Sequence, residues 1–186
     1  MPTAFGHALV GMGFGAFAVS SNRALKHNVS TVLSMTAVSV IPDLDVIAFG
    51  LGIPYSHPLG HRGFFHSALF ALFSACLFWW LCRKGSKKSS NEPLSVKILA
   101  IFILVGLSHP LLDMLTDGGL GIAFFSPLSY ERHFFPFQPI PVSPIGLSKR
   151  VLPILWWETR LFLPGVLAAW AFACGIPKAI SSPRRH

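Results

Sequence analysis

Residues 94–115, LSVKILAIFILVGLSHPLLDML, decide the fold class, because a long apolar run ends here in a histidine and an aspartate. A transmembrane helix needs about 20 mostly apolar residues, with a usual range of about 17–25. His109 and Asp113 are four residues apart, so both project from one face of such a helix. Ionisable side chains inside a membrane segment are costly, and they therefore indicate a function. The segment predicts a membrane-spanning helix that carries part of a polar site.

Four further apolar runs flank this one. They cover residues 4–20, 29–51, 66–82 and 151–176. The chain is 52% hydrophobic and only 12% charged, whereas soluble proteins contain about 25% charged residues. The run at 29–51 is interrupted at Pro42, so its apolar part is expected to end near Ile41. We therefore predict an all-α, polytopic membrane helix bundle of about five transmembrane helices, formed by one domain over residues 1–186.

The basic residues predict the topology. Lys and Arg favour cytoplasmic loops, and ten of the fifteen fall in the three groups 23–26, 83–97 and 178–185. With five helices these groups share one side, which places the N-terminus outside and the C-terminus in the cytoplasm. The charge of +8 is thus a topology signal, and we expect no binding to nucleic acid. Residues 83–93 form a flexible basic cytoplasmic loop in this scheme, and the Pro- and aromatic-rich residues 116–150 form an outer interfacial loop.

Histidines and acids gather at the predicted outer ends of these helices. Carboxylates brought close together repel one another unless a cation compensates, and imidazole with carboxylate suits zinc, with iron or manganese as alternatives. Seven candidates exceed one tetrahedral site, so two or more ions are favoured. The predicted metal ligands are His7, Asp43, Asp45, His61, His66, His109 and Asp113.

This constellation predicts hydrolysis by a metal-activated water. Asp45 is the candidate to accept the proton of that water, and Arg62 is the candidate to pair with a phosphate oxygen. An equally weighted role for Arg62 is to anchor a phospholipid headgroup. Asp117 and Glu158 are expected either to ligate the metal or to support its ligands, and Glu158 also suits a simple first-turn helix acid.

The same residues carry a family resemblance. The Thr-x-x-x-His segment, PDLD, HRGxxHS and SHPLLDxxTDGG, spread over residues 3–158, resemble the LexA-regulated, inner-membrane metal-dependent hydrolases (YdjM-like proteins). The resemblance implies a bacterial inner membrane protein, with the family's ligand positions on the seven residues named above. The order of motifs is also similar to zinc-dependent phospholipase C. Those enzymes continue with a further His and an HxxxE pair, where this chain has only His133 and Glu158 without that spacing.

We therefore expect a membrane-bound hydrolase that cleaves a phosphoester or ester in a lipid or other membrane-proximal substrate, with its site toward the periplasmic face. Membrane lipids are the expected partners. The alternative is a metal-binding transporter or sensor, since intramembrane His and Asp also form ion pathways. A purely structural membrane protein does not explain why His and Asp gather while Lys does not.

Overall fold

The computed structural model describes residues 2–19, 24–87, 94–145 and 151–180. Regular structure in this part of the chain is helical, apart from two isolated β-bridges, Thr116 with Ile140 and Ile122 with His133. The long helices are α1 (Ala4–Gly15), α2 (Leu25–Val40), α4 (Ala68–Lys87), α5 (Val96–Met114) and α6 (Val151–Ile180). The predicted all-α class is confirmed.

Four helical segments are long and apolar enough to cross a membrane: Leu25–Gly50, Ala68–Ser86, Val96–Met114 and Val151–Cys174. The fifth apolar helix, Ala4–Ala18, joins α1 to the 3₁₀ turn η1 (Ala16–Ala18) and is shorter than these spans. Large apolar side chains such as Leu33, Phe73 and Leu167 are exposed on the outside of the bundle, where a bilayer covers them. The membrane helix bundle is therefore confirmed, with α1 as a short fifth member.

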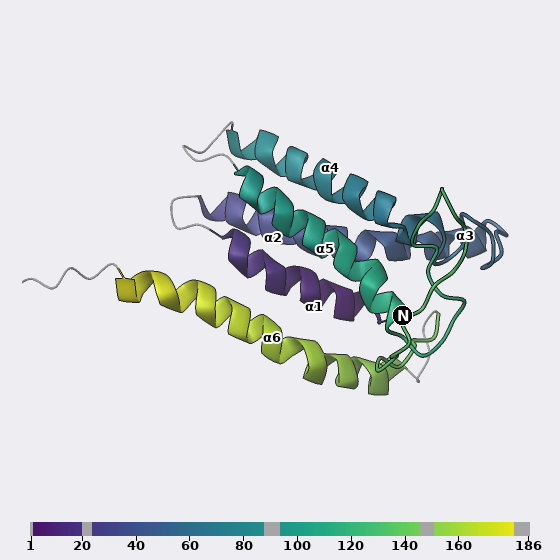
Figure 1. Ribbon diagram of the computed structural model, residues 1–186. Helices are drawn as coiled ribbons and strands as arrows, with labels where there is room; N and C mark the ends of the chain where they lie inside the picture. Colours follow the sequence, from purple (N-terminus) through teal and green to yellow (C-terminus); the bar gives the residue numbers. More distant parts are fainter. Residues whose placement is uncertain (1, 20–23, 88–93, 146–150, 181–186) are drawn as a thin grey trace, which may run out of the picture.

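The chain after α2 changes its helical type at a proline. α2 ends at Val40 and is followed by the 3₁₀ helix η2 (Ile41–Val46) and the short α3 (Ile47–Gly50). Pro42 has no N–H to donate, which ends the α-helical hydrogen bonding close to the predicted position. Asp43 and Asp45 are both buried in η2. Figure 1 shows η2 and α3 reaching beyond the neighbouring helix ends.

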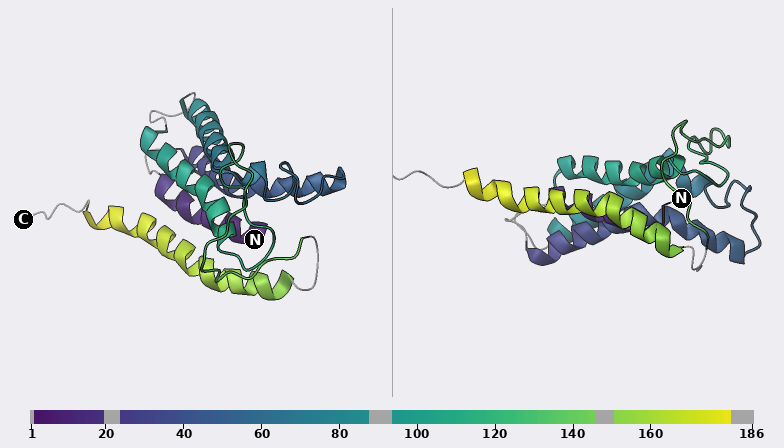
Figure 2. Two further views of the ribbon diagram at one scale, coloured as in Figure 1. Left: turned by 45° about the vertical axis from the view of Figure 1, so that its right-hand side comes forward. Right: turned by 90° about the horizontal axis from the view of Figure 1, so that it is seen from below.

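The bundle core lies between α2, α4 and α5, and α6 lies along α1 (Figures 1 and 2). Met35, Val38, Phe102 and Val105 fill this core with almost no exposed surface. At Gly11, a Cβ atom would lie 2.8 Å from the Cα of Thr36, so α1 and α2 approach more closely than a larger residue permits.

Five helix ends meet at one end of the bundle: the N-termini of α1, α4 and α6, and the C-termini of α2 and α5 (Figure 1). The segment 116–145 crosses this end. Arg132 holds the segment in place, since its guanidinium donates to the carbonyl oxygens of Tyr55 and His61. Residues 146–150 of the predicted interfacial loop and 88–93 of the predicted basic loop lie outside the described residues, while 83–87 form the end of α4.

Candidate metal centre

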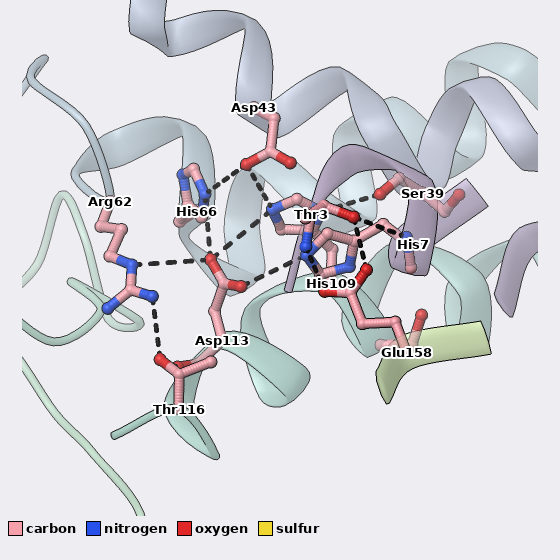
Figure 3. A network of polar contacts seen from close by, with 12 residues as sticks. Thr3, His7, Ser39, Asp43, Arg62, His66, His109, Asp113, Thr116 and Glu158 are labelled. Atoms are coloured by element: carbon pink, nitrogen blue, oxygen red, sulfur yellow. Dashed lines mark hydrogen bonds and ion pairs between the residues drawn. The ribbon is translucent and has the colours of Figure 1, made fainter. Parts of the chain in front are cut away.

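Four buried side chains from η2, η3 (Phe64–His66) and α5 point toward one another at this end (Figure 3). They are Asp43, His66, His109 and Asp113, and one ligand atom from each lies within 4.8 Å of the others. Both oxygens of Asp43, Nε2 of His66 and of His109, and Oδ2 of Asp113 are buried without a hydrogen-bond partner. Buried polar atoms are normally paired, so these four side chains have ligand atoms available and could hold a metal ion.

The spacing of these atoms matches a metal polyhedron. Nε2 of His66 lies 3.3 Å from Oδ2 of Asp113 and 3.5 Å from Oδ1 of Asp43. Nε2 of His109 lies 3.6 Å from Oδ1 of Asp43 and 3.9 Å from Oδ2 of Asp113. Tetrahedral bonds of about 2.0–2.1 Å place neighbouring ligand atoms about 3.4 Å apart. The four residues therefore fit a single ion with little movement.

Both histidines are held so that Nε2 faces the centre. Nδ1 of His66 lies 3.0 Å from Oδ2 of Asp45, and Nδ1 of His109 lies 2.7 Å from the carbonyl oxygen of Ser39. A carbonyl oxygen only accepts, so Nδ1 of His109 donates and Nε2 is left free to ligate. Metal-binding histidines usually donate their other ring N–H to a carboxylate or carbonyl. The structure supplies this arrangement at His109, and at His66 a carboxylate oxygen lies at ion-pair distance from Nδ1.

His66 lies among three carboxylates. It precedes α4, and burial alone would lower the pKa of its imidazole. The carboxylates of Asp113, Asp43 and Asp45 beside the ring outweigh burial and hold this pKa well above its usual range. The surroundings of His66 therefore favour a positive charge. Metal binding replaces protons on such ligands.

His7 stands beside this group on α1. Its Nε2 lies 3.2 Å from Oδ1 of Asp113, and its ring stacks on that of His109 with centroids 3.8 Å apart. The start of α1 is fixed by α6, because both the backbone N–H and the hydroxyl of Thr3 donate to the carboxylate of Glu158. The Thr3 hydroxyl in turn accepts from the N–H of Gly6 as the helix cap. Glu158 thus sets the position of the helix that carries His7.

Asp45 and His61 form a second, overlapping group with His66. Oδ1 of Asp45 lies 2.6 Å from Nδ1 of His61, and Oδ2 accepts from the backbone N–H of Arg62 at 3.1 Å. Nδ1 of His66 lies 3.0 Å from the same Oδ2, so three nitrogens surround the carboxylate of Asp45. These contacts give Asp45 the geometry of a residue that orients His66.

Arg62 closes the site on the side of the 116–145 segment. Its side chain is buried, and its guanidinium donates to the carbonyl oxygen of Gly118 at 2.7 Å and to the hydroxyl of Thr116 at 2.9 Å. Its Nε lies 3.8 Å from Oδ2 of Asp113. One guanidinium thus stands against the three carboxylates of Asp43, Asp45 and Asp113, and a divalent cation would balance the remainder.

Gly119 has no room for a side chain, which yields a first prediction. Its φ is +93°, and a Cβ there would lie 2.5 Å from Nη1 of Arg62 and 2.8 Å from the hydroxyl of Tyr55. Gly52 has a similar φ of +73° but open space around it. Alanine costs about 1–2 kcal/mol in backbone strain at either position, and only Gly119→Ala also displaces Arg62.

We therefore expect Gly119→Ala to lower the thermal unfolding midpoint of the detergent-solubilised protein more than the matched Gly52→Ala. Equal decreases would show that the arginine can shift freely and does not depend on the glycine. The comparison isolates the contact, because the backbone strain is of the same kind in both variants.

The remaining predicted residues lie outside the four-residue group. Asp117 is exposed and accepts from the N–H of Val142 at 2.7 Å. Glu158 is buried against Thr3. Three contributors were not predicted from the sequence: the carbonyl of Ser39, the hydroxyl of Thr116 and the guanidinium of Arg132. Only Thr116 had a signal, since it opens the Thr-Asp-Gly-Gly stretch that carries Gly118 and Gly119.

The helix ends of this membrane bundle bring imidazoles and carboxylates around one point. The chain is therefore a multi-pass membrane protein with a candidate metal centre. The chain belongs to the YdjM inner membrane protein family, which it matches over residues 1–180. It is 31% identical over 182 residues to the inner membrane protein YbcI of Escherichia coli (strain K12), covering 90% of this chain and 97% of that relative. No solved structure matches it. Family and helices together identify a multi-pass inner membrane protein.

Proposed function

We propose that this protein is a membrane-bound metal-dependent hydrolase that cleaves a phosphoester or ester bond in a lipid or another membrane-proximal substrate. One observation carries the proposal: four buried ligand atoms without hydrogen-bond partners lie within 4.8 Å of one another, as residues that share a metal ion do. Hydrolysis suits a His/Asp metal site that has carboxylate oxygen to spare for proton transfer.

Asp43, His66, His109 and Asp113 are the residues that would hold the ion, with His7 beside them. Two imidazoles and two carboxylates suit zinc, with iron or manganese as alternatives. A metal ion here supplies a Lewis acid and lowers the pKa of water. A second ion bound by Asp45, His61 and His66 would have to replace the contact between Asp45 and His66. We therefore expect one ion per chain.

The chain offers two proton acceptors. Asp45, the candidate from the sequence, is already engaged by His61 and by the backbone N–H of Arg62, with Nδ1 of His66 at 3.0 Å. Asp43 has no hydrogen-bond partner on either oxygen, so one oxygen can face an ion while the other takes a proton. We therefore place the general base at Asp43, with Asp45 orienting His66. Arg62 is held by Gly118 and Thr116 next to Asp113, where its charge offsets that carboxylate.

The test is metal analysis of the purified protein, followed by hydrolysis assays on phospholipid vesicles with and without chelator. We expect one metal ion per chain and an activity that chelator removes and metal restores. Wild-type protein without metal would overturn the proposal. Stoichiometric metal with no hydrolysis, together with metal uptake into proteoliposomes, would establish the transporter alternative in its place.

We also propose that the site faces the periplasm, as the distribution of Lys and Arg predicts. Leu128 in the 116–145 segment is 95% exposed at the site end, whereas Lys84 lies near the other end of α4. In a background without Cys76, Cys82 and Cys174, we expect Leu128→Cys to react with a membrane-impermeant maleimide in cells with a permeabilised outer membrane. Lys84→Cys is expected to react only after the inner membrane is opened, and the reverse pattern would invert the topology.

A further inference from the structure

An apolar groove lies beside the candidate metal centre, on the side formed by η2, α3 and the start of α4. Its volume is about 470 Å³, within the size range of small-molecule sites. Its lining includes Ile41, Leu44, Ile47, Ala48, Phe65 and Phe70. Leu44 and Ile47 are more than half exposed, although both are large and apolar.

The groove and the centre are built from the same short segments. Groove residues Ile41 and Leu44 alternate with Asp43 and Asp45 along η2. Phe65 of the groove directly precedes His66. Whatever fills the groove therefore contacts the backbone that positions the candidate ligands.

Asp45 forms the wall between the two. It lines the groove, yet its carboxylate has no exposed surface and is bound from the other side by His61 and His66. Asp45 therefore lies between the groove and the ring of His66, which is one of the four residues of the centre.

The chemistry of the lining selects the occupant. Nine of the ten lining residues are apolar, so the groove suits a hydrocarbon chain and offers no set of donors to a soluble sugar or nucleotide. η2 and α3, which supply five of its lining residues, extend past the neighbouring helix ends (Figure 1). Phospholipids surround an inner membrane protein. Each phospholipid carries acyl chains together with ester and phosphodiester bonds.

We propose that this groove binds one acyl chain of a membrane phospholipid and so presents the headgroup side of that lipid to the centre. This proposal rests on the proposed function, because the bound lipid is a substrate only if the protein is a hydrolase. The groove itself is tested by binding, without turnover.

The probe is a phospholipid with a photoactivatable diazirine near the end of one acyl chain, incorporated in nanodiscs with the intact protein. We expect crosslinks to concentrate on residues 41–53 and 59–70. Ala48→Phe fills the groove at a residue that is only 9% exposed, and it is expected to reduce these crosslinks about tenfold, equivalent to about 1.4 kcal/mol of binding free energy. The metal content is expected to stay at the wild-type level.

The matched control is Ala169→Phe, which fills a separate apolar groove between α1 and α6. It is expected to leave crosslinking at 41–53 unchanged. If Ala48→Phe loses metal or fails to fold, Leu51→Gln takes its place, because Leu51 lines the groove and is 75% exposed. Crosslinks spread evenly over the lipid-facing helices, or unchanged in the groove variants, would overturn the proposal.

Two outcomes separate this proposal from the proposed function. Concentrated crosslinks without any lipid hydrolysis would support the groove and count against the hydrolase. Metal-dependent hydrolysis of a short-chain phosphodiester without concentrated crosslinks would support the hydrolase and overturn the groove.

Discussion

Asp113→Asn is expected to release the metal almost completely. The carboxylate of Asp113 contacts Nε2 of His7 at 3.2 Å and of His66 at 3.3 Å, so it is the residue that joins both histidines to the centre. Asparagine keeps the shape but removes the negative charge. Loss of an outer contact to a metal ligand already weakens binding about 10–100-fold, so loss of a ligand carboxylate is expected to exceed about 100-fold. Metal content after gel filtration and competition titration with a chelating dye would measure the change.

Asp117→Asn is the matched control. Asp117 lies four residues further along, is exposed, and uses one carboxylate oxygen to accept from the N–H of Val142, which an asparagine oxygen also accepts. We expect metal content and hydrolysis to remain at wild-type levels in this variant. Equal losses in both variants would mean that general negative charge at this end retains the metal, and a normal metal content in Asp113→Asn would remove Asp113 from the ligand set.

The features of the centre that depend on local periodicity could be predicted from the sequence. His109 and Asp113 are four residues apart on a long apolar helix, and their facing atoms do lie 3.9 Å apart. The alternation of helix direction also brings the acidic and histidine motifs to one end, because each motif lies at the boundary of an apolar run. Membrane length fixes these boundaries, so the sequence indicates them well.

The division of roles between Asp43 and Asp45 could not be predicted. In a 3₁₀ helix each residue turns by about 120°, so side chains two apart point in different directions. Asp43 therefore joins His109 and Asp113, whereas Asp45 turns to His61. The sequence shows two carboxylates that point to different faces of one helical segment, and only the packing of η2 against α5 decides which of them faces the centre.

Contacts made by the backbone, or between segments far apart in the chain, could also not be predicted from the sequence. The carbonyl of Ser39 fixes the ring of His109, and every residue offers such a carbonyl. Thr3 and Glu158 are 155 residues apart, and their contact exists only because α6 lies along α1. Glu158 was left open between ligand, support and helix acid, and the structure places it against the cap of α1.

Arg62→Met is expected to destabilise the protein, and to do so most strongly without metal. The side chain is almost fully buried, with donors to Gly118 and Thr116 and Nε 3.8 Å from Asp113. Removing one partner of a buried charge pair costs about 3–5 kcal/mol, because the other charge is left uncompensated. A bound cation compensates the same carboxylates, so the loss is expected to shrink when metal is present. Thermal unfolding in detergent, with metal or with chelator, measures both states.

The outcome distinguishes two roles for this arginine. If Arg62 only pairs with a substrate phosphate, Arg62→Met raises KM and leaves unfolding unchanged in both conditions. If it balances the buried carboxylates, the unfolding midpoint falls and the fall is larger in chelator. Arg160→Met is the control, since Arg160 is exposed over the ring of Trp156 and lies outside the centre. The geometry favours the second result, because both terminal nitrogens of Arg62 are already engaged by the protein.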